Sequence, residues 1–327
     1  MKNLSLENKR VVLFYPDFFG YGNKIANAMR EMKVNVSLHN SRPVKSAFAR
    51  AIFKIFPELV LKYSKSYYTN ILNAHKDENL DYIVVVERLP IWFLKEMKKS
   101  HPSAKLILYM DDSIKNLKCI EKRFPYFDRI LSFDKNDVDK HDNIIFRPLF
   151  YTEKKVEKKT NYKYDLCFIG TCHSDRYSIV KAVEKQCDKG KFYYYLYLQS
   201  PFMYLYYKVT NKGYRAAKRS DFKYEKLDYK ENIEIEDSSK VILDIQHPAQ
   251  SGLTMRTIEM VGLKKKTITT NKDICNYDFY RPENIMVIDR DNPIINKEFF
   301  DIPYTELPDD IYYKYDIRQW IVDVLGV

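Results

Sequence analysis

The sequence predicts an α/β fold with two Rossmann-like, doubly wound domains facing each other and a helix at the C-terminal end. Three observations predict it. Short apolar strand-like runs alternate with helical patterns, which is typical of parallel sheets covered by helices on both faces. The alternation stops once, at a polar stretch, and then restarts. A chain of 327 residues is also long enough for two domains that each bury a core.

Six β-rich runs bounded by polar residues are expected as strands of the first domain, at residues 10–16, 34–40, 81–87, 104–110, 129–133 and 143–148. Helical patterns separate most of them, as in KIANAMREMK (24–33) and FLKEMKKS (93–100). The next stretch, TEKKVEKKTNYK (152–163), is basic and has no periodicity, so it predicts a linker. We therefore place the first domain at residues 1–155.

Strand-like runs restart after this linker, at residues 164–170, 191–198, 241–247, 266–271 and 284–289. The last stretch, DIYYKYDIRQWIVDVLG (310–326), predicts a helix. The two halves share no sequence repeat, but the same alternation occurs in both. We place the second domain, including this C-terminal helix, at residues 156–327.

The amino-acid composition indicates the cellular compartment and the kind of binding partner to expect. No apolar run reaches the ~18 residues needed to span a bilayer, and the N-terminal segment lacks the apolar core of a signal peptide. The five cysteines show no CxxC spacing, which predicts free thiols in a reducing compartment and a cytoplasmic protein. A net charge of +11 predicts a polyanionic partner: nucleic acid, an anionic membrane or phosphate-bearing ligands. The 28 tyrosines and 19 phenylalanines, mixed with basic residues, suit single-stranded RNA as well as a membrane surface.

Ligands of doubly wound sheets bind at the carboxyl ends of the strands. In the first domain three carboxylates follow predicted strands: Asp17 after the first, Glu87 at the end of the third, and Asp112 after the fourth. The pair Asp111-Asp112 fits a metal motif, because hard cations prefer carboxylate oxygens. Asp112 or Ser113 equally fits an N-cap of a helix over SIKNLKCIEKRF (113–124). A cap and a catalytic base are not exclusive, so all three carboxylates are candidate bases.

The second domain opens with FIGTCHSDR (168–176), a strand followed by a helix start. Backbone groups at Gly170 and Thr171, the helix dipole and Arg176 together suit a phosphate or diphosphate. The alternative is that Asp175 caps the helix and Arg176 lies on a solvated surface. His173 is a candidate substrate contact in the same loop, although a lone loop histidine is more often structural.

The stretch HPAQSGLTMRTIEMVGLKKKTITTN (247–271) has the same strand–helix–strand pattern. Gly252 leads into a helix through Thr254, and Gly262 is placed as a C-cap glycine. Arg256 suits a phosphate, and Glu259 suits the two hydroxyls of a ribose. The alternative is an exposed ion pair between Arg256 and Glu259, three residues apart on one helical face.

These motifs carry a family resemblance that covers most of the chain. The segments FIGTCHSDR, DIQHPAQSGLTMRTIEMVGLKKKTITTN (244–271) and YDFYRPENIMVIDRDN (277–292) look like the C-terminal half of bacterial GT-B glycosyltransferases. In particular they resemble the spore-maturation-protein-like group found in capsule and lipopolysaccharide gene clusters. In the first half, LYMDDSIKN (108–116) and RILSFDKND (129–137) resemble the same group.

The resemblance implies transfer of a sugar from a nucleotide-sugar donor, bound by the second domain, to a glycan or lipid-linked glycan acceptor, bound by the first. Glu259 would bind the donor ribose. The helix start at Gly252 would approach the diphosphate. Arg256 and nearby amides would stabilise the departing diphosphate without a metal ion or cofactor. An inverting reaction would take its base from Asp112, Asp17 or Glu87, in that order.

Two features depart from a simple match. Many members carry an E-x7-E pair, and the position of the earlier glutamate is Ser251 here, so the sequence leaves the stereochemical outcome open. Residues 289–291 (DRD) fit a DxD metal pattern, but we interpret them as a loop because metal-dependent GT-A folds place this motif elsewhere.

The segment 191–226 combines aromatic residues in its first half with lysines and arginines in its second. It is typical of an interfacial surface on an anionic membrane, and a buried strand followed by a core helix is the alternative.

We expect a location in the cytoplasm or on the inner face of the cell membrane. A non-catalytic module that binds RNA or anionic membrane is the competing function, although no RNA-binding signature is present. A nucleotide-sugar epimerase is a third, weakened by the missing G-x-G-x-x-G after the first strand.

Overall fold

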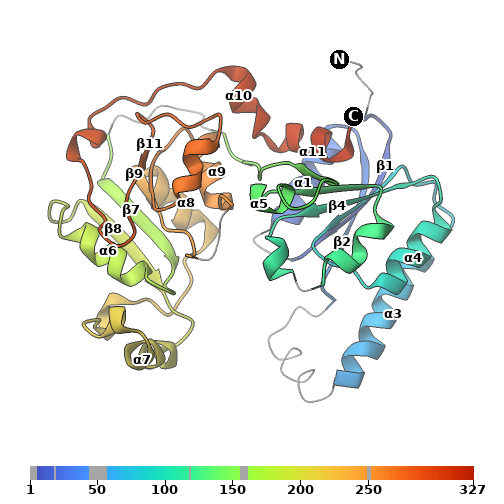
Figure 1. Cartoon of the computed structure of the whole chain (residues 1–327), viewed down its shortest axis with the longest axis horizontal. Coiled ribbons are helices and arrows are strands. Elements are labelled where there is room, and N and C mark those ends of the chain that lie inside the picture. The colour runs from blue at the N-terminus through green and yellow to red at the C-terminus, as the bar shows by residue number, and fades with distance from the viewer. Residues whose placement is uncertain (1–5, 18–19, 44–56, 118, 155–160, 249–251) are drawn as a thin grey trace. The chain divides into compact units, whose positions relative to one another are not determined.

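The computed structural model describes residues 6–17, 20–43, 57–117, 119–154, 161–248 and 252–327. They form two compact units (Figure 1). The first unit is Met1–Phe150 with Asp316–Val327, and the second is Tyr151–Tyr315. Each unit contains one parallel sheet, as the sequence predicted.

The sheet of the first unit has the order β2-β1-β3-β4-β5-β6 among the described residues. Its strands are β1 (Arg10–Tyr15), β2 (Asn35–Asn40), β3 (Tyr82–Val86), β4 (Lys105–Met110), β5 (Arg129–Ser132) and β6 (Ile144–Phe146). All of them pair in parallel, and all six lie within or beside the predicted runs. The chain leaves β1 toward β2 and returns to β3 on the other side, so the topological switch point lies between β1 and β3.

Helices cover both faces of this sheet. Those in the described residues are α1 (Tyr21–Glu31), α3 (Pro57–His75), α4 (Ile91–Ser100), the single turn α5 (Lys135–Val138) and α11 (Ile317–Leu325). Val12, Phe14 and Leu108 point toward the core that contains Phe93 of α4. The alternate residues of the strands face α1 and α11, as Tyr109 does when its ring packs 4.8 Å from that of Trp320.

The segment 113–124 differs from the single helix that was expected. It forms two 3-10 turns, η1 (Ile114–Asn116) and η2 (Glu121–Tyr126). Cys119 between them has φ 57°, a left-handed conformation that an α-helix cannot contain. The amide of Ile114, at the start of η1, donates to the Asp137 carboxylate (3.0 Å).

The second sheet has the order β11-β10-β9-β7-β8 among the described residues, again with parallel pairing. Its strands are β7 (Tyr164–Thr171), β8 (Phe192–Tyr197), β9 (Ser239–Asp244), β10 (Lys266–Thr269) and β11 (Ile285–Val287). The helices of this unit are α6 (Arg176–Glu184), α7 (Pro201–Thr210), α8 (Tyr229–Asp237), α9 (Met255–Gly262) and α10 (Asp309–Lys314).

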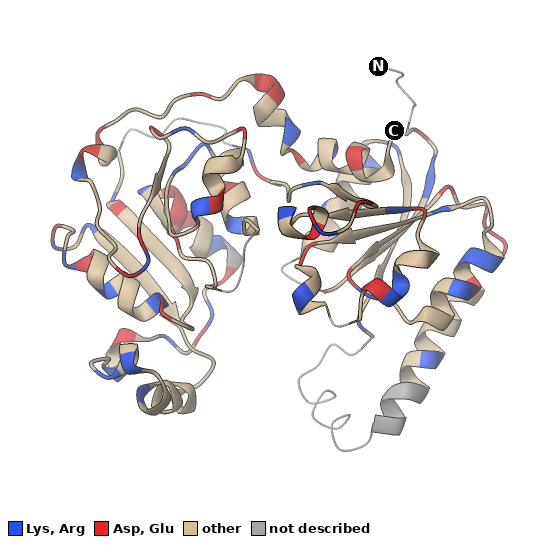
Figure 2. Cartoon of the chain, viewed as in Figure 1, with Lys and Arg blue, Asp and Glu red and all other residues tan. Residues whose placement is uncertain are grey.

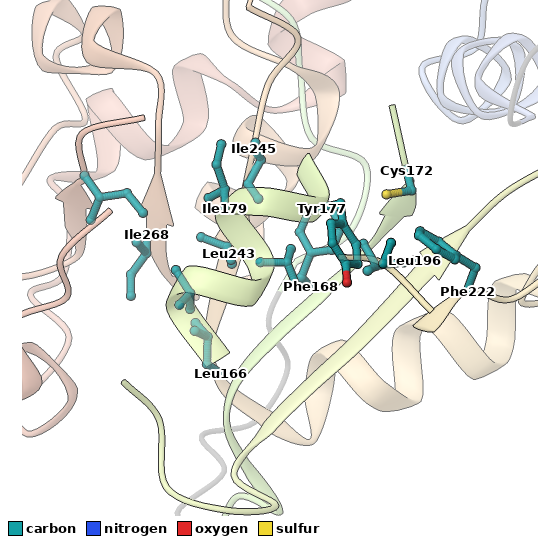
Figure 3. Packing of buried hydrophobic residues seen from close by; sticks show 14 of the residues in the cluster. Leu166, Phe168, Cys172, Tyr177, Ile179, Leu196, Phe222, Leu243, Ile245 and Ile268 are labelled. Atoms are coloured by element: carbon teal, nitrogen blue, oxygen red, sulfur yellow. The ribbon is translucent and has the colours of Figure 1, made fainter. Parts of the chain in front are cut away.

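The main core of the second unit lies between its sheet and α6 (Figure 3). Leu166, Phe168 and Leu243 of the strands are fully buried there, together with Ile179 of α6. Cys167 and Ile242 face the opposite side, where Met260 of α9 covers them. Both faces are therefore apolar, which explains why the strands are almost continuously hydrophobic in sequence.

The C-terminal segment differs from the sequence-based domain assignment. The expected single helix over 310–326 is divided into α10 and α11, because Asp316 caps the second helix by accepting from the Arg318 amide (2.7 Å). The helix α11 belongs to the first unit, where Figure 1 shows it beside α1. The Trp320 ring packs 4.7 Å from that of Phe150, and buried Arg147 pairs with Asp323 (2.8 Å). An apolar helix face fits either sheet equally well in sequence, and these contacts decide which one it covers.

The described part of the chain contains no helix that is both long and apolar enough to cross a membrane. All five cysteines are free.

Candidate active site

The carboxyl edge of the first sheet brings three polar side chains to the switch point. Tyr15 is the last residue of β1, Glu87 follows β3 and Asp111 follows β4, and these three strands are neighbours in the sheet. In doubly wound folds this edge is where ligands bind. The three residues therefore form a candidate catalytic cluster.

Asp111 is the least satisfied polar group of this cluster. The Tyr15 hydroxyl donates to its Oδ2 (3.2 Å), whereas its Oδ1 is buried and has no hydrogen-bond partner among the described residues. Burial, followed by the nearby charge of Glu87, raises the pKa of Asp111 to about 7. A carboxyl group with a pKa near neutrality can both accept and release a proton at physiological pH, which is what a general base or acid needs.

Tyr15 fixes the position of Asp111. Burial and then the Asp111 charge raise the pKa of the Tyr15 phenol far above its ordinary value, so the hydroxyl stays protonated and acts as the donor. The ring of Tyr15 packs against the start of α1, where a Cβ at Gly22 would lie 3.1 Å from the Tyr15 Cβ. Gly22 thus allows the close approach of helix and strand that holds this tyrosine.

Glu87 is held in an unusual backbone conformation. Its φ is 69°, in the left-handed region that costs about 1–2 kcal/mol for a residue with a Cβ. Its carboxylate is nearly buried and forms a bidentate pair with Arg42, with Nε–Oε2 at 3.1 Å and Nη2–Oε1 at 2.7 Å. Because Arg42 occupies both carboxylate oxygens, Glu87 is a weaker candidate for the base. Its negative charge acts instead on Asp111, whose pKa it raises.

The other two sequence-predicted bases have different surroundings. Asp112 Oδ1 accepts from the Ser113 amide (2.8 Å) and from Asn116 Nδ2 (2.8 Å), so this carboxylate caps the 3-10 turn η1. Asp17 is exposed in the loop after β1, and its amide donates to Asn40 (3.3 Å). The geometry favours Asp111 over Asp112, the residue that we ranked first from the sequence.

The carboxyl edge of the second sheet is built around Arg176. Its Nε donates to the carbonyl of Ile245 (2.8 Å) and its Nη1 to that of Thr171 (2.9 Å), so it joins the ends of β9 and β7. Gly170 packs tightly against Phe168, since a Cβ there would lie 3.2 Å from the Phe168 ring, whereas its 3.5 Å distance from Arg176 Nη1 would be an ordinary contact. The structure thus brings the predicted residues Gly170, Thr171 and Arg176 together. Two nitrogens of the Arg176 guanidinium already donate to backbone carbonyls at the strand ends.

Two further guanidinium groups lie near Arg176. Burial and then the charge of Arg256 lower the pKa of Arg176 to about 10, and Arg290 contributes in the same direction. Arg290 is held by Asp175 (2.7 and 2.8 Å) and by the carbonyl of Gln246 (2.9 Å). Arg256 donates no hydrogen bond to any described residue. We call these three residues the arginine cluster. Its charge is partly compensated, because Asp175 pairs with Arg290 and the carboxylates of Asp244 and Glu236 interact electrostatically with Arg176 and Arg256. Three guanidinium groups at one edge still offer donors that suit a phosphate or diphosphate.

Arg290 was missed as a site residue from the sequence. It lies in the DRD stretch, where Asp289 accepts from the amides of Asp291 (2.9 Å) and Asn292 (3.1 Å). This local turn agrees with the interpretation of residues 289–291 as a loop. Nothing local in the sequence marks Arg290, because its partner Asp175 is more than a hundred positions away.

The helix α9 begins as predicted. Thr254 is its N-cap and accepts from the Thr257 amide (3.2 Å), while the Thr257 hydroxyl donates to buried Asp244 at the end of β9 (2.6 Å). Gly252 lies two residues before this cap. Arg256 occupies the first turn. Ser251, where the family pattern has a glutamate, lies outside the described residues.

Glu259 makes contacts that the sequence did not predict. Its Oε2 accepts from the amide of Thr152 (3.2 Å) and its Oε1 from the Thr152 hydroxyl (3.1 Å). The alternative ion pair with Arg256 does not form in the described structure. A carboxylate has about four acceptor positions, and the two contacts with Thr152 use part of this capacity. The ribose assignment of Glu259 stays a prediction.

Gly262 has a different role from the one expected. It was predicted as a C-cap glycine, but it is the last helical residue of α9, and the cap is Leu263. A Cβ at position 262 would lie 2.5 Å from both the Glu153 carbonyl oxygen and the Tyr151 ring. The glycine is required because the chain of residues 151–153 crosses the helix in close contact.

We expect Gly262→Ala to lower the free energy of unfolding by about 2–4 kcal/mol, because the new methyl group overlaps backbone that cannot rotate away. Urea denaturation followed by circular dichroism measures this. Gly190→Ala is the control: Gly190 has φ 79°, but a Cβ added there would have no neighbour within 4 Å, so this substitution should cost only about 1 kcal/mol. Equal effects of the two substitutions would contradict the packing role of Gly262.

Two histidines complete this edge. The rings of His173 and His247 lie 5.3 Å apart, and burial followed by the charge of Arg176 lowers the pKa of His173 to about 4. His173 is therefore neutral at physiological pH and can accept or donate a hydrogen bond without adding charge. Among the described residues no three His, Cys, Asp or Glu side chains are placed to hold a metal ion.

Comparison with known proteins agrees with this architecture. No family model matches the sequence, and no curated protein matches it. Among solved structures, HepE of Anabaena in complex with UDP-glucose has a TM-score of 0.60 at 7% identity and covers 97% of this chain and 98% of its own. A glycosyltransferase from Rickettsia africae has a TM-score of 0.56 at 12% identity, covering 97% and 94%. The apo form of WaaB, a lipopolysaccharide outer core galactosyltransferase, has 0.52 at 10%, covering 97% and 99%. At these identities the likeness shows the fold, so this chain has the GT-B fold predicted from its sequence.

Proposed function

We propose that this protein is a glycosyltransferase that moves a sugar from a nucleotide-sugar donor to a glycan or lipid-linked glycan acceptor in bacterial surface polysaccharide synthesis. The arginine cluster beside the N-terminus of α9 carries this proposal. It offers positive charge where a diphosphate would bind at the carboxyl edge of the second sheet. The GT-B fold supports it, since HepE, which shares that fold, was solved with UDP-glucose. Membership of the spore-maturation-protein-like group is part of the same proposal.

In this proposal the donor binds to the second unit. Arg256 contacts the diphosphate, while Arg176 and Arg290 are held by protein groups at the same edge of the sheet. As the bond from the anomeric carbon to the diphosphate breaks, negative charge grows on the leaving oxygen. Fixed guanidinium groups stabilise that charge more than they stabilise the bound donor, which lowers the barrier.

The acceptor belongs to the first unit in the same proposal. In an inverting reaction the acceptor oxygen attacks the anomeric carbon as the diphosphate leaves, and a base must take the hydroxyl proton. Asp111 suits this role better than Asp112, because its Oδ1 lacks a hydrogen-bond partner among the described residues and its pKa is raised to about 7.

The experiment that tests the function is a thermal-shift screen of the whole chain against UDP-, GDP-, CMP- and TDP-sugars. We expect one nucleotide class to raise the melting temperature, because a ligand that binds only the folded state stabilises it. If none does, whereas single-stranded RNA does, a nucleic-acid-binding module replaces the transferase.

Arg256→Gln provides a second test, on the diphosphate contact. We expect it to weaken binding of the nucleoside diphosphate by about tenfold, since one charge-assisted contact is lost. Binding of the matching nucleoside, which lacks phosphate, should not change. Calorimetry with both ligands separates the two. Equal weakening of both, or of neither, would remove Arg256 from the diphosphate site.

A further inference from the structure

The helix α7 is attached to the second unit by one face. Tyr204 is buried, its ring lies 5.6 Å from that of Phe222, and its hydroxyl donates to the carbonyl of Ala217 (3.1 Å). Lys208 donates to the same carbonyl (3.2 Å). At the start of the helix, Ser200 caps it, and Pro201 occupies the first turn. The position of α7 is therefore determined by packing and by hydrogen bonds.

The opposite face of α7 is apolar and exposed. Its exposed fractions are 71% for Phe202, 58% for Leu205, 51% for Tyr206 and 83% for Val209. These positions follow the i, i+3, i+4, i+7 pattern and span an arc of about 100° on the helix. We call these four residues the apolar stripe. Among the described residues, no other helix exposes as many large apolar side chains, and a contiguous patch of this kind marks an interaction surface.

Basic residues lie beside the apolar stripe. Residues 208–226 contain seven Lys or Arg, all exposed, and two Asp or Glu, which is a net charge of +5. Of the two acidic residues, Asp221 is occupied by the Tyr177 hydroxyl (2.8 Å) and the Lys218 amide (2.8 Å). The 3-10 turn η3 (Lys212–Tyr214) contacts α7 directly. Figure 2 shows α7 with almost no charge beside a segment that carries Lys and Arg.

The composition of this surface selects among partners. Aliphatic Leu205 and Val209 cannot stack on bases, which makes single-stranded RNA a poor fit. Pairing of two copies through the apolar stripe would place two net charges of +5 next to each other, which opposes association. An anionic bilayer accepts the apolar side chains below its headgroups and attracts the basic residues at the same time.

We propose that α7 docks the protein onto the surface of a membrane rich in anionic lipid, with the apolar stripe inserted and the basic residues of 208–226 at the headgroups. A helix of ten residues is too short to span a bilayer and lies along its surface instead. Docking goes beyond the proposed sugar transfer and does not rest on it.

The test is co-sedimentation of the full chain with vesicles of phosphatidylcholine alone or mixed with phosphatidylglycerol. We expect binding to the mixed vesicles only, weakened by salt. The double variant Phe202→Ser, Val209→Ser should bind them at least about tenfold more weakly. Ile294→Ser is the matched control, because Ile294 is 63% exposed in the same unit but lies outside α7; it should bind like the wild type. Replacing Lys212 and Arg215 by Glu should remove the preference for phosphatidylglycerol.

Three results would overturn the proposal: no binding of the wild type to mixed vesicles, wild-type binding by the double variant, or a dimer that the double variant abolishes. The melting temperature of the double variant checks its folding, and should stay at the wild-type value because both replaced side chains are exposed. Response to nucleotide-sugars is read separately, so failure of docking and failure of the proposed transferase remain distinguishable.

Discussion

Asp111→Asn is expected to lower the turnover rate of sugar transfer by about 10²- to 10⁴-fold, the usual contribution of a positioned acid or base. The substitution keeps the shape of the side chain and its acceptor for the Tyr15 hydroxyl. It removes only the group that can take a proton. Donor affinity should not change, because the proposed donor site lies in the second unit. A steady-state assay with separate kcat and donor KM values measures this.

The pH dependence follows from the raised pKa. Because the ionised form of Asp111 is the base and its pKa is about 7, the rate of the wild type should rise about tenfold per pH unit below that value and level off above it. Asp111→Asn should lack this rise. A retaining reaction would not need the base, and a rate that is independent of pH between 5 and 8 would point to it.

The free energy of unfolding should also depend on the ionisation of Asp111, but it should fall as pH rises, whereas the rate rises. The folded-state pKa of about 7 lies above the ordinary aspartate value of 3.8, so the native state disfavours the charge. The wild type should therefore lose stability as pH rises from about 4 to 7, by at most about 4 kcal/mol. Asp111→Asn should be more stable than the wild type at pH 8, with the difference shrinking toward pH 4. Urea denaturation at several pH values measures it.

Asp112→Asn is the matched control for both measurements. Asp112 is adjacent in sequence, but its carboxylate caps η1. We expect a small loss of stability and no change in the pH profile. If Asp112→Asn abolishes the rate and Asp111→Asn does not, the order that we derived from the sequence is restored and the structural argument is wrong.

Glu259→Gln is expected to weaken nucleotide-sugar binding by about 10²-fold or more. A carboxylate that accepts from two ribose hydroxyls makes two charge-assisted hydrogen bonds, each stronger than its neutral counterpart. Glutamine retains one acceptor oxygen and presents a donor in place of the other. Calorimetry with the nucleotide found in the screen measures the loss.

Thr152→Val separates the ribose role from an anchoring role. It removes the hydroxyl that donates to Glu259 Oε1 and leaves the carboxylate in place. We expect it to lower stability slightly while nucleotide affinity stays within a few-fold of the wild type. If both variants lose only stability, and by similar amounts, Glu259 anchors residues 151–153 to α9 and does not bind ribose.

Much of the fold could be predicted because it depends on local patterns. Apolar runs of strand length, separated by helical periodicity, indicated the described strands of both sheets and their parallel pairing. The N-cap at Thr254 was also predictable, since the cap and the amide that it accepts are three residues apart. These features need only neighbouring residues, so the sequence contains the whole signal.

The sequence was sufficient to locate the candidate site at the strand ends, but not to identify which carboxylate there is the base. Both faces of β4 are buried, so hydrophobicity does not tell Asp111 from Asp112. The alternation of side chains between the two faces of a strand does distinguish Asp111 from Asp112. Asp111 lies on the same face as Tyr109, and Tyr15 lies on that side of the sheet as well. Recognising it requires knowing that β1 and β4 flank β3, which is a property of the sheet order.

The amino-acid sequence by itself determined two parallel α/β sheets, a positive charge, and polar residues at the strand ends where ligands bind. The tertiary structure decided which of those residues are free to react. It placed α11 in the first unit and left the apolar stripe of α7 exposed. It also paired Glu87 with Arg42 and brought Thr152 within hydrogen-bonding distance of Glu259. The reason is that a side chain's pKa and availability depend on partners distant in sequence, and only folding brings those partners together.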